Sequence, residues 1–179
     1  MCIRDSIRPD GTPGPRYALP YKEGGFQVVS AGFRVDDHVV VSGSAWVTRE
    51  GEQKRVAYIK GYGMDGEEVV HYHQYSKTEV FGNMAFTEAG FRDFQSRWAA
   101  AEDGRVAAAL SFDDYVIHVW NADGTPAFVI ERPDHACLER DDEEIDVFQT
   151  VYEGMTRWNP GSTFAVSPHH AAVEQLQFR

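Results

Sequence analysis

The sequence predicts an all-β protein built from repeated four-stranded antiparallel sheets. Asp-Gly dipeptides recur at nearly regular spacing, at Asp10, Asp65 and Asp123, and the longer phrase Asp-Gly-Thr-Pro occurs twice, at 10–13 and 123–126. The runs beside these dipeptides are short and rich in β-branched and aromatic residues, without a long helical period. Because Asp-Gly tolerates the positive φ of a tight turn, each dipeptide marks a β-hairpin.

A second hairpin precedes each of the two later Asp-Gly hairpins, so each repeat contains four strands. The strands expected in the two repeats are 26–34, 38–44, 56–63 and 67–75, followed by 97–101, 105–111, 115–121 and 125–133. Aligned on their turns, the repeats place Ile59 opposite Ile117 and Tyr62 opposite Trp120. The Ala-rich run at 105–111 is too short for a stable helix and has the small side chains expected where backbones approach closely.

The composition argues against two kinds of environment, a nucleic-acid partner and the interior of a membrane. The chain has 179 residues, 42% hydrophobic and 25% charged, as in an ordinary globular protein. Its 17 basic and 28 acidic residues give a net charge of -11, which argues against nucleic acid as a partner because binding to phosphates needs positive charge. The apolar runs are too short for a transmembrane segment.

The opening residues 1–6, MCIRDS, resemble the translation of a sequencing-library adaptor, and we set them aside in interpreting the fold. With Cys2 excluded, Cys137 is the one remaining cysteine, so no disulfide is expected within the chain. On this interpretation, the chain is a fragment cut at both ends.

The stretch EDGRVAAALSFDDYVIHVWNADGTPAFVIERP, residues 102–133, resembles one blade of the six-bladed β-propeller proteins of bacteria, related in form to NHL-repeat propellers. The likeness is weaker over 26–75 and marginal over 7–20. It implies a partial β-propeller, whose missing blades would belong to the full-length chain. Its parts are the end of a blade at 7–20, blades at 26–75 and 95–133, a helical insertion at 134–170 and the first strand of another blade at 171–179.

The resemblance is diagnostic of fold and weak for function, because propellers carry many unrelated activities. It leaves the cellular location open, and an extracytoplasmic location, periplasmic or as a lipoprotein, is compatible with it for the full-length protein.

Strand direction divides such a repeat into two sides. If the strands alternate, the tight turns lie on one side, here called the turn side, and the connections 46–54, 76–93 and 134–170 lie on the other, the connection side. Long connections on a rigid scaffold are where binding usually occurs. The ligand-binding residues expected on the connection side are Trp46, Asn83, Asp113, Asp114, His169 and His170.

The longest connection contains a predicted helix, at 140–158, which begins with acidic residues at the positive end of its dipole. Its expected apolar stripe consists of Ile145, Phe148, Val151, Tyr152, Met155 and Trp158. We interpret this stripe as the side of the helix that packs on the rim of the scaffold. The alternative is a helix that docks a partner or closes as a lid.

Several residues resemble catalytic or metal-binding groups without completing a site. His71 and His73 would share one face of a strand, but zinc needs at least one more ligand, so we interpret them as solvent-exposed histidines. Asp113 and Asp114 are also typical turn residues, and Cys137 has no motif partner. The sequence therefore predicts no catalytic residue, no metal site and no cofactor.

The function expected is that of a non-catalytic binding or scaffolding module that engages a protein, peptide or glycan through the connection side. The alternative is a fragment of a metal-dependent propeller hydrolase or lactonase, in which several blades send acidic and amide side chains to a cation on the central axis. Asp113 and Asn83 are the residues that such a site would use.

We predict that this chain binds no divalent ion tightly, because residues with ligand side chains do not occur at metal-binding spacing. Calorimetric titration with Ca²⁺ and Zn²⁺ should detect no site with a dissociation constant below roughly micromolar. A saturable stoichiometric site abolished by His71→Ala or Asp113→Ala would contradict this prediction and favour the hydrolase alternative.

Overall fold

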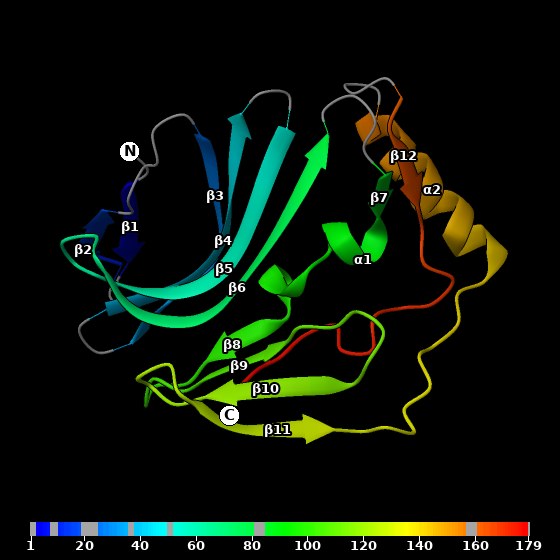
Figure 1. Cartoon of the computed structure of the whole chain (residues 1–179). Helices are drawn as coiled ribbons and strands as arrows, with labels where there is room; N and C mark the ends of the chain where they lie inside the picture. Colours follow the sequence, from blue (N-terminus) through cyan, green and yellow to red (C-terminus); the bar gives the residue numbers. More distant parts are fainter. Residues whose placement is uncertain are drawn as a thin grey trace.

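The structure is a computed structural model that describes residues 3–7, 11–18, 25–35, 38–49, 52–80, 85–156 and 161–178. Two four-stranded antiparallel sheets dominate it (Figure 1). The first sheet consists of β3 (Gly25–Val35), β4 (His38–Arg49), β5 (Glu52–Gly63) and β6 (Glu68–Val80). The second sheet consists of β8 (Trp98–Ala100), β9 (Val106–Ala109), β10 (Val116–Trp120) and β11 (Pro126–Glu131). The expected all-β class and the four-stranded sheets are confirmed, and neither sheet closes on itself in the described part of the chain.

Smaller elements flank the sheets. The hairpin of β1 (Ile3–Ile7) and β2 (Pro13–Ala18) includes four of the six residues set aside as adaptor. The remaining elements are β7 (Ala85–Thr87), α1 (Glu88–Phe91), a 3₁₀ helix (Phe94–Ser96), α2 (Asp142–Thr156) and β12 (Thr163–Ala165). β7 and β12 pair in parallel although the 75 residues 88–162 lie between them in the sequence. The described parts of the two long connections therefore fold together into one unit, here called the insertion layer (85–93, 134–156 and 161–170), which lies beside the sheets in Figure 1.

The Asp-Gly turns adopt the geometry that the sequence predicts. Gly66, Gly104 and Gly124 have φ of 86°, 83° and 82°, a region that favours glycine. The buried Tyr72 hydroxyl donates hydrogen bonds to the carbonyls of Gly104, at 3.3 Å, and Ala122, at 3.2 Å. A side chain of one sheet thus fixes both turns of the other, and these turns lie together on the turn side.

The two sheets stack front to back, with equivalent residues facing equivalent directions. Ile59 of the first sheet faces the second sheet, and its counterpart Ile117 faces away from the first sheet. Trp120 faces the first sheet, whereas its counterpart Tyr62 lies on the far face of that sheet. The core between the sheets contains Val35, Val40, Ala57, Ile59, Tyr72, Phe94, Trp98, Val106, Ala108 and Trp120.

The connection expected at 46–54 is for the most part an extended hairpin. β4 and β5 stay paired from Trp46 opposite Arg55 to Arg49 opposite Glu52. Trp46 is therefore a strand residue, and its predicted loop position is wrong. The local signal was ambiguous, because Trp, Val and Thr at 46–48 favour a strand as much as the following charged residues favour a loop.

The helix occurs where the sequence predicts it, and its first described turn contains Asp142, Glu143 and Glu144. Its inner side packs on β12, where the rings of Tyr152 and Phe164 stack with centroids 3.9 Å apart. Val151 does not belong to this side, since it is 57% exposed, and its assignment to the packed stripe is wrong. The side chains of Met155 and Trp158 lie outside the described residues.

The C-terminal segment (171–178) is not a strand, because no partner strand pairs with it in the described part of the chain. Its Val173 is nevertheless buried, against Ala107, Ala109, Ile117 and Val119 on the far face of the second sheet. The segment thus covers part of the far face of the second sheet.

We predict that Tyr72→Phe lowers the free energy of unfolding by about 1–2 kcal/mol at neutral pH, because two turn carbonyls lose their donor. Burial, followed by the negative charge of Asp123, raises the pKa of Tyr72 to about 12. Unfolded tyrosine ionises near pH 10, so the wild type loses stability between roughly pH 10 and 12.

Urea unfolding at neutral pH and near pH 11 measures both effects. The loss of stability at high pH should be smaller in Tyr72→Phe than in the wild type, while Tyr62, whose pKa burial also raises, contributes equally in both proteins. Tyr75→Phe is the matched control, because Tyr75 is exposed. An equally steep alkaline loss in Tyr72→Phe would show that Tyr72 does not contribute to it.

Candidate functional site

Three loops on the connection side join into one surface, here called the loop platform (111–114, 137–140 and 167–170). The amide of Arg140 donates to the carbonyl of Pro168 at 3.0 Å, and the amide of His170 donates to the carbonyl of Leu138 at 2.9 Å. The amide of Ala172, which follows the platform, donates to the carbonyl of Phe112 at 2.8 Å. The ends of the long insertion are thus held together and placed on the loop between β9 and β10.

The platform brings together four of the six residues expected to bind a ligand. His169 Nε2 lies 3.5 Å from Asp113 Oδ1, and Asp114 and His170 are their neighbours in the chain. Trp46 lies apart from them, with the Arg55 guanidinium 5.4 Å from its ring centroid. Arg55 in turn bonds to the Gly90 carbonyl and to Asp93, which ties the extended hairpin to the insertion layer. Asn83 falls outside the described residues.

The two aspartates have different roles. Asp114 Oδ2 accepts a hydrogen bond from Ser111 Oγ at 2.9 Å, and that hydroxyl oxygen also accepts from the amides of Asp113 and Asp114. Asp114 therefore shapes its own loop, as the turn interpretation expected. The Asp113 side chain is 63% exposed and presents its carboxylate to solvent beside His169.

Cys137 contacts the same loop. Its Sγ donates to the carbonyl of Asp113 at 3.2 Å, and burial followed by the charges of Asp113 and Asp114 raises the pKa of this thiol. A thiolate is the reactive form of cysteine, so this environment disfavours a nucleophilic role.

Below the platform, a fully buried carboxylate holds the insertion layer together. The Glu88 side chain has no exposed surface and accepts hydrogen bonds from both terminal nitrogens of Arg140, at 2.8 Å for Nη2. It also accepts from the amide of Ser167 at 3.1 Å and from Arg92 Nη1 at 3.3 Å. Arg92 then reaches Glu174 of the C-terminal segment at 2.7 Å. One carboxylate thus links α1, both ends of the long insertion and, through Arg92, the segment that follows.

Hydrogen bonding decides the charge of Glu88. Burial alone would raise the pKa of this carboxyl, but the hydrogen bonds from Arg140 and Ser167 and the charge of Arg140 bring it below its ordinary value. Glu88 is therefore ionised at neutral pH. Sequence reasoning missed this pair, since no local pattern joins Glu88 to a residue 52 positions away.

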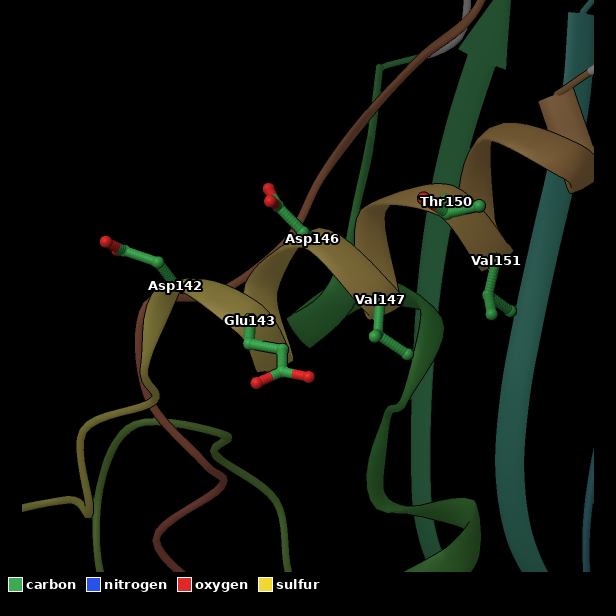
Figure 2. A pocket seen from close by; sticks show the side chains of 6 residues that line it. All are labelled: Asp142, Glu143, Asp146, Val147, Thr150 and Val151. Atoms are coloured by element: carbon green, nitrogen blue, oxygen red, sulfur yellow. The ribbon is translucent and has the colours of Figure 1, made fainter.

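The outer side of α2 forms a second exposed surface, here called the acidic helix surface (Asp142, Glu143, Asp146, Val147, Thr150 and Val151). Its described residues line an open hollow of about 550 Å³. Figure 2 shows Val147 and Val151 on one side of the helix together with Glu143, and Asp142 and Asp146 on the neighbouring side. The two valines are 58% and 57% exposed, and Leu138 of the platform is 72% exposed. This surface therefore exposes apolar side chains and carboxylates side by side.

The histidine pair of β6 does not share a face. A β-bulge lies between His71 and His73, because Lys60 pairs with His71 while Ile59 pairs with His73. The extra residue turns His73 toward the second sheet, where its ring meets Phe94 edge to face at 4.8 Å. His71 is exposed and contacts Glu68, so the prediction of two exposed histidines on one face is wrong. In the described part of the chain, no three His, Cys, Asp or Glu side chains lie where they could hold a metal ion.

Comparison with known proteins gives no family assignment: no family model, no curated protein and no solved structure matches this chain. None of the helices that the structure describes is long and apolar enough to cross a membrane.

We predict that Glu88→Gln lowers the free energy of unfolding by about 3–5 kcal/mol, because it leaves the buried charge of Arg140 without its carboxylate. Amide exchange should accelerate most at 137–140 and 163–170. Since the folded-state pKa of Glu88 lies below its ordinary value of 4.5, its contribution is present above that pH and is lost as the pH falls through the folded-state value.

Glu143→Gln is the matched control, because Glu143 is exposed on the same layer. The acid-induced loss of stability should be reduced in Glu88→Gln and unchanged in Glu143→Gln. Equal exchange rates in wild type and Glu88→Gln would show that the pair does not hold the layer together.

Proposed function

We propose that this chain is part of a β-propeller that acts as a non-catalytic binding module, and that its connection side recognises a positively charged, partly apolar segment of another protein. The observation that carries the proposal is the acidic helix surface, where Val147 and Val151 are exposed among three carboxylates. The loop platform extends this chemistry with Asp113, Glu139 and the exposed Leu138.

The stacking of the sheets supports the propeller. In a sandwich of two sheets, the inner faces carry the core and the outer faces are solvated. Here Ile117, the counterpart of Ile59, is buried on the far face of the second sheet under Val173. Both faces of the second sheet are thus covered in part, as in a propeller blade between two neighbours. The strands of the first sheet, with 11 to 13 residues, are longer than those of the second, so the two units are unequal blades.

The chemistry of the platform supports binding rather than catalysis. Cys137 has a raised pKa, Asp114 is bonded within its own loop, and Glu88 is saturated with donors beneath the surface. Hydrogen bonds thus hold these groups within or beneath the platform, and loops that a scaffold holds in place and that present exposed side chains suit recognition.

Charge indicates the partner. The chain carries a net charge of -11, and the exposed rim of the acidic helix surface consists of Asp142, Glu143 and Asp146. A partner with lysine or arginine around an apolar patch matches this surface in both charge and hydrophobicity. The proposal therefore favours a basic amphipathic segment over an acidic or neutral one.

The test uses a fluorescein-labelled amphipathic peptide of leucine and lysine at helical spacing, with binding followed by anisotropy. The variant Asp142→Asn/Glu143→Gln/Asp146→Asn should weaken binding about tenfold, from three exposed ion pairs at roughly 0.5 kcal/mol each. Val147→Ser/Val151→Ser should weaken it by a similar factor, and binding by the wild type should decrease as salt screens the charges.

The matched controls remove the same kinds of side chain elsewhere. Glu67→Gln/Glu102→Gln removes exposed acids of the turn side, and Val129→Ser removes an exposed valine of β11. Both should bind like the wild type. The proposal fails if the peptide does not bind, or if the controls lose as much affinity as the helix variants.

A further inference from the structure

A cavity of about 520 Å³ lies at the edge of β8, away from the acidic helix surface. It is lined by one residue of β3, by Gln95, Ser96 and residues 98–100, and by residues 175–178. The side chains that characterise it are Phe33, Gln95, Trp98, Gln175, Gln177 and Phe178. Its volume is in the range of sites for small molecules, roughly 300–1,000 Å³.

The described lining of this cavity contains no ionisable side chain, although a quarter of the chain is charged. Three of its residues are aromatic and three are glutamines. A glutamine amide both donates and accepts hydrogen bonds and carries no charge. The cavity therefore offers flat apolar faces beside neutral polar groups.

The polar groups of the cavity have hydrogen-bonding capacity to offer. Gln175 and Gln177 are exposed and make no hydrogen bond to another described residue, while Leu176 between them packs on the second sheet. The indole Nε1 of Trp98 is buried, and no described residue accepts its hydrogen bond. Because this nitrogen has no exposed surface, a ligand in the cavity would depend on the exposed amides of Gln175 and Gln177.

The aromatic groups are held in position. Phe33 meets Trp98 edge to face, with ring centroids 5.1 Å apart, and Phe33 remains 43% exposed. Phe178 is 38% exposed on the segment that faces β8. The lining of the cavity thus includes two partly exposed rings, of which Phe33 packs against the buried indole of Trp98.

We propose that this cavity binds a neutral sugar residue of a glycan. A pyranose ring has an apolar C–H face, which packs on an aromatic ring, and a rim of hydroxyl groups, which donate to and accept from amides. Among the described lining residues a cation would find no carboxylate and an anion no basic group, and the net charge of the chain is -11. A purely apolar ligand would leave the amides of Gln175 and Gln177 without a hydrogen-bond partner in the cavity.

This site goes beyond the peptide-binding surface proposed above and shares no residue with it. The two proposals therefore fail separately, because the peptide test depends on α2 and the sugar test depends on β8 and the C-terminal segment.

The test titrates the full chain with the neutral disaccharides cellobiose, maltose and lactose, with saturation-transfer NMR and tryptophan fluorescence as readouts. Glucuronate and glucosamine are the charged counterparts. At least one neutral disaccharide should bind with a dissociation constant on the order of 1 mM, and the charged sugars should bind more weakly. Gln175→Ala/Gln177→Ala and Phe178→Ala should each weaken binding about tenfold, which corresponds to about 1.4 kcal/mol.

The variants replace exposed side chains, so the fold should persist, and circular dichroism checks this. Gln74→Ala and Phe128→Ala are matched controls, because both residues are exposed in edge strands outside the cavity. Absence of saturable binding by all three neutral disaccharides overturns the proposal. Equal binding of the charged sugars, or an equal loss in the control variants, overturns it as well.

Discussion

The buried pair of Glu88 and Arg140 is the interaction on which the connection side depends. Two charges removed from water are stable only when each is paired and hydrogen-bonded, and the Glu88 carboxylate meets this condition with donors from Arg140, Ser167 and Arg92. Because these donors come from different connections, satisfying one carboxylate fixes several loops at once. The β7–β12 pairing, the base of α2 and the loop platform follow from that constraint.

The turn side is stabilised by different interactions. There, glycines with positive φ permit tight turns, and the Tyr72 hydroxyl of one sheet is shared between two turn carbonyls of the other. This side is closely packed, since a Cβ added at Gly124 would lie 2.6 Å from the carbonyl oxygen of His71. The two sides are thus stabilised differently, by close packing of glycine turns on the turn side and by a buried ion pair beneath the long connections on the other.

The sequence was sufficient wherever local chemistry decides the structure. Asp-Gly turns, β-branched runs and the acidic first turn of the helix are local signals. The eight strands of the two sheets and α2 occur at the predicted positions, although β4, β5 and β6 extend beyond their predicted bounds and the segment 171–178 is not a strand. Asp113 and His169 come together because the alternating strand directions put both loops on one side. Non-local choices escaped prediction: the parallel pairing of β7 with β12, the burial of Glu88, and the bulge that turns His73 away from His71. Each depends on a contact between distant segments or on a one-residue shift in register, which a short sequence window does not encode.

The two proposed binding surfaces differ in charge, so a single ligand class does not suit both. The acidic helix surface carries three carboxylates, whereas the described lining of the β8 cavity carries none. They are nevertheless connected, because the C-terminal segment contributes Gln175 and Gln177 to the cavity and Glu174 to Arg92, which bonds to Glu88 below the platform. A sugar that orders this segment would also order the Arg92 contact. The contact of Glu174 with Arg92 thus links the two surfaces, and by reciprocity any energetic coupling between the two ligands would affect both affinities by the same factor.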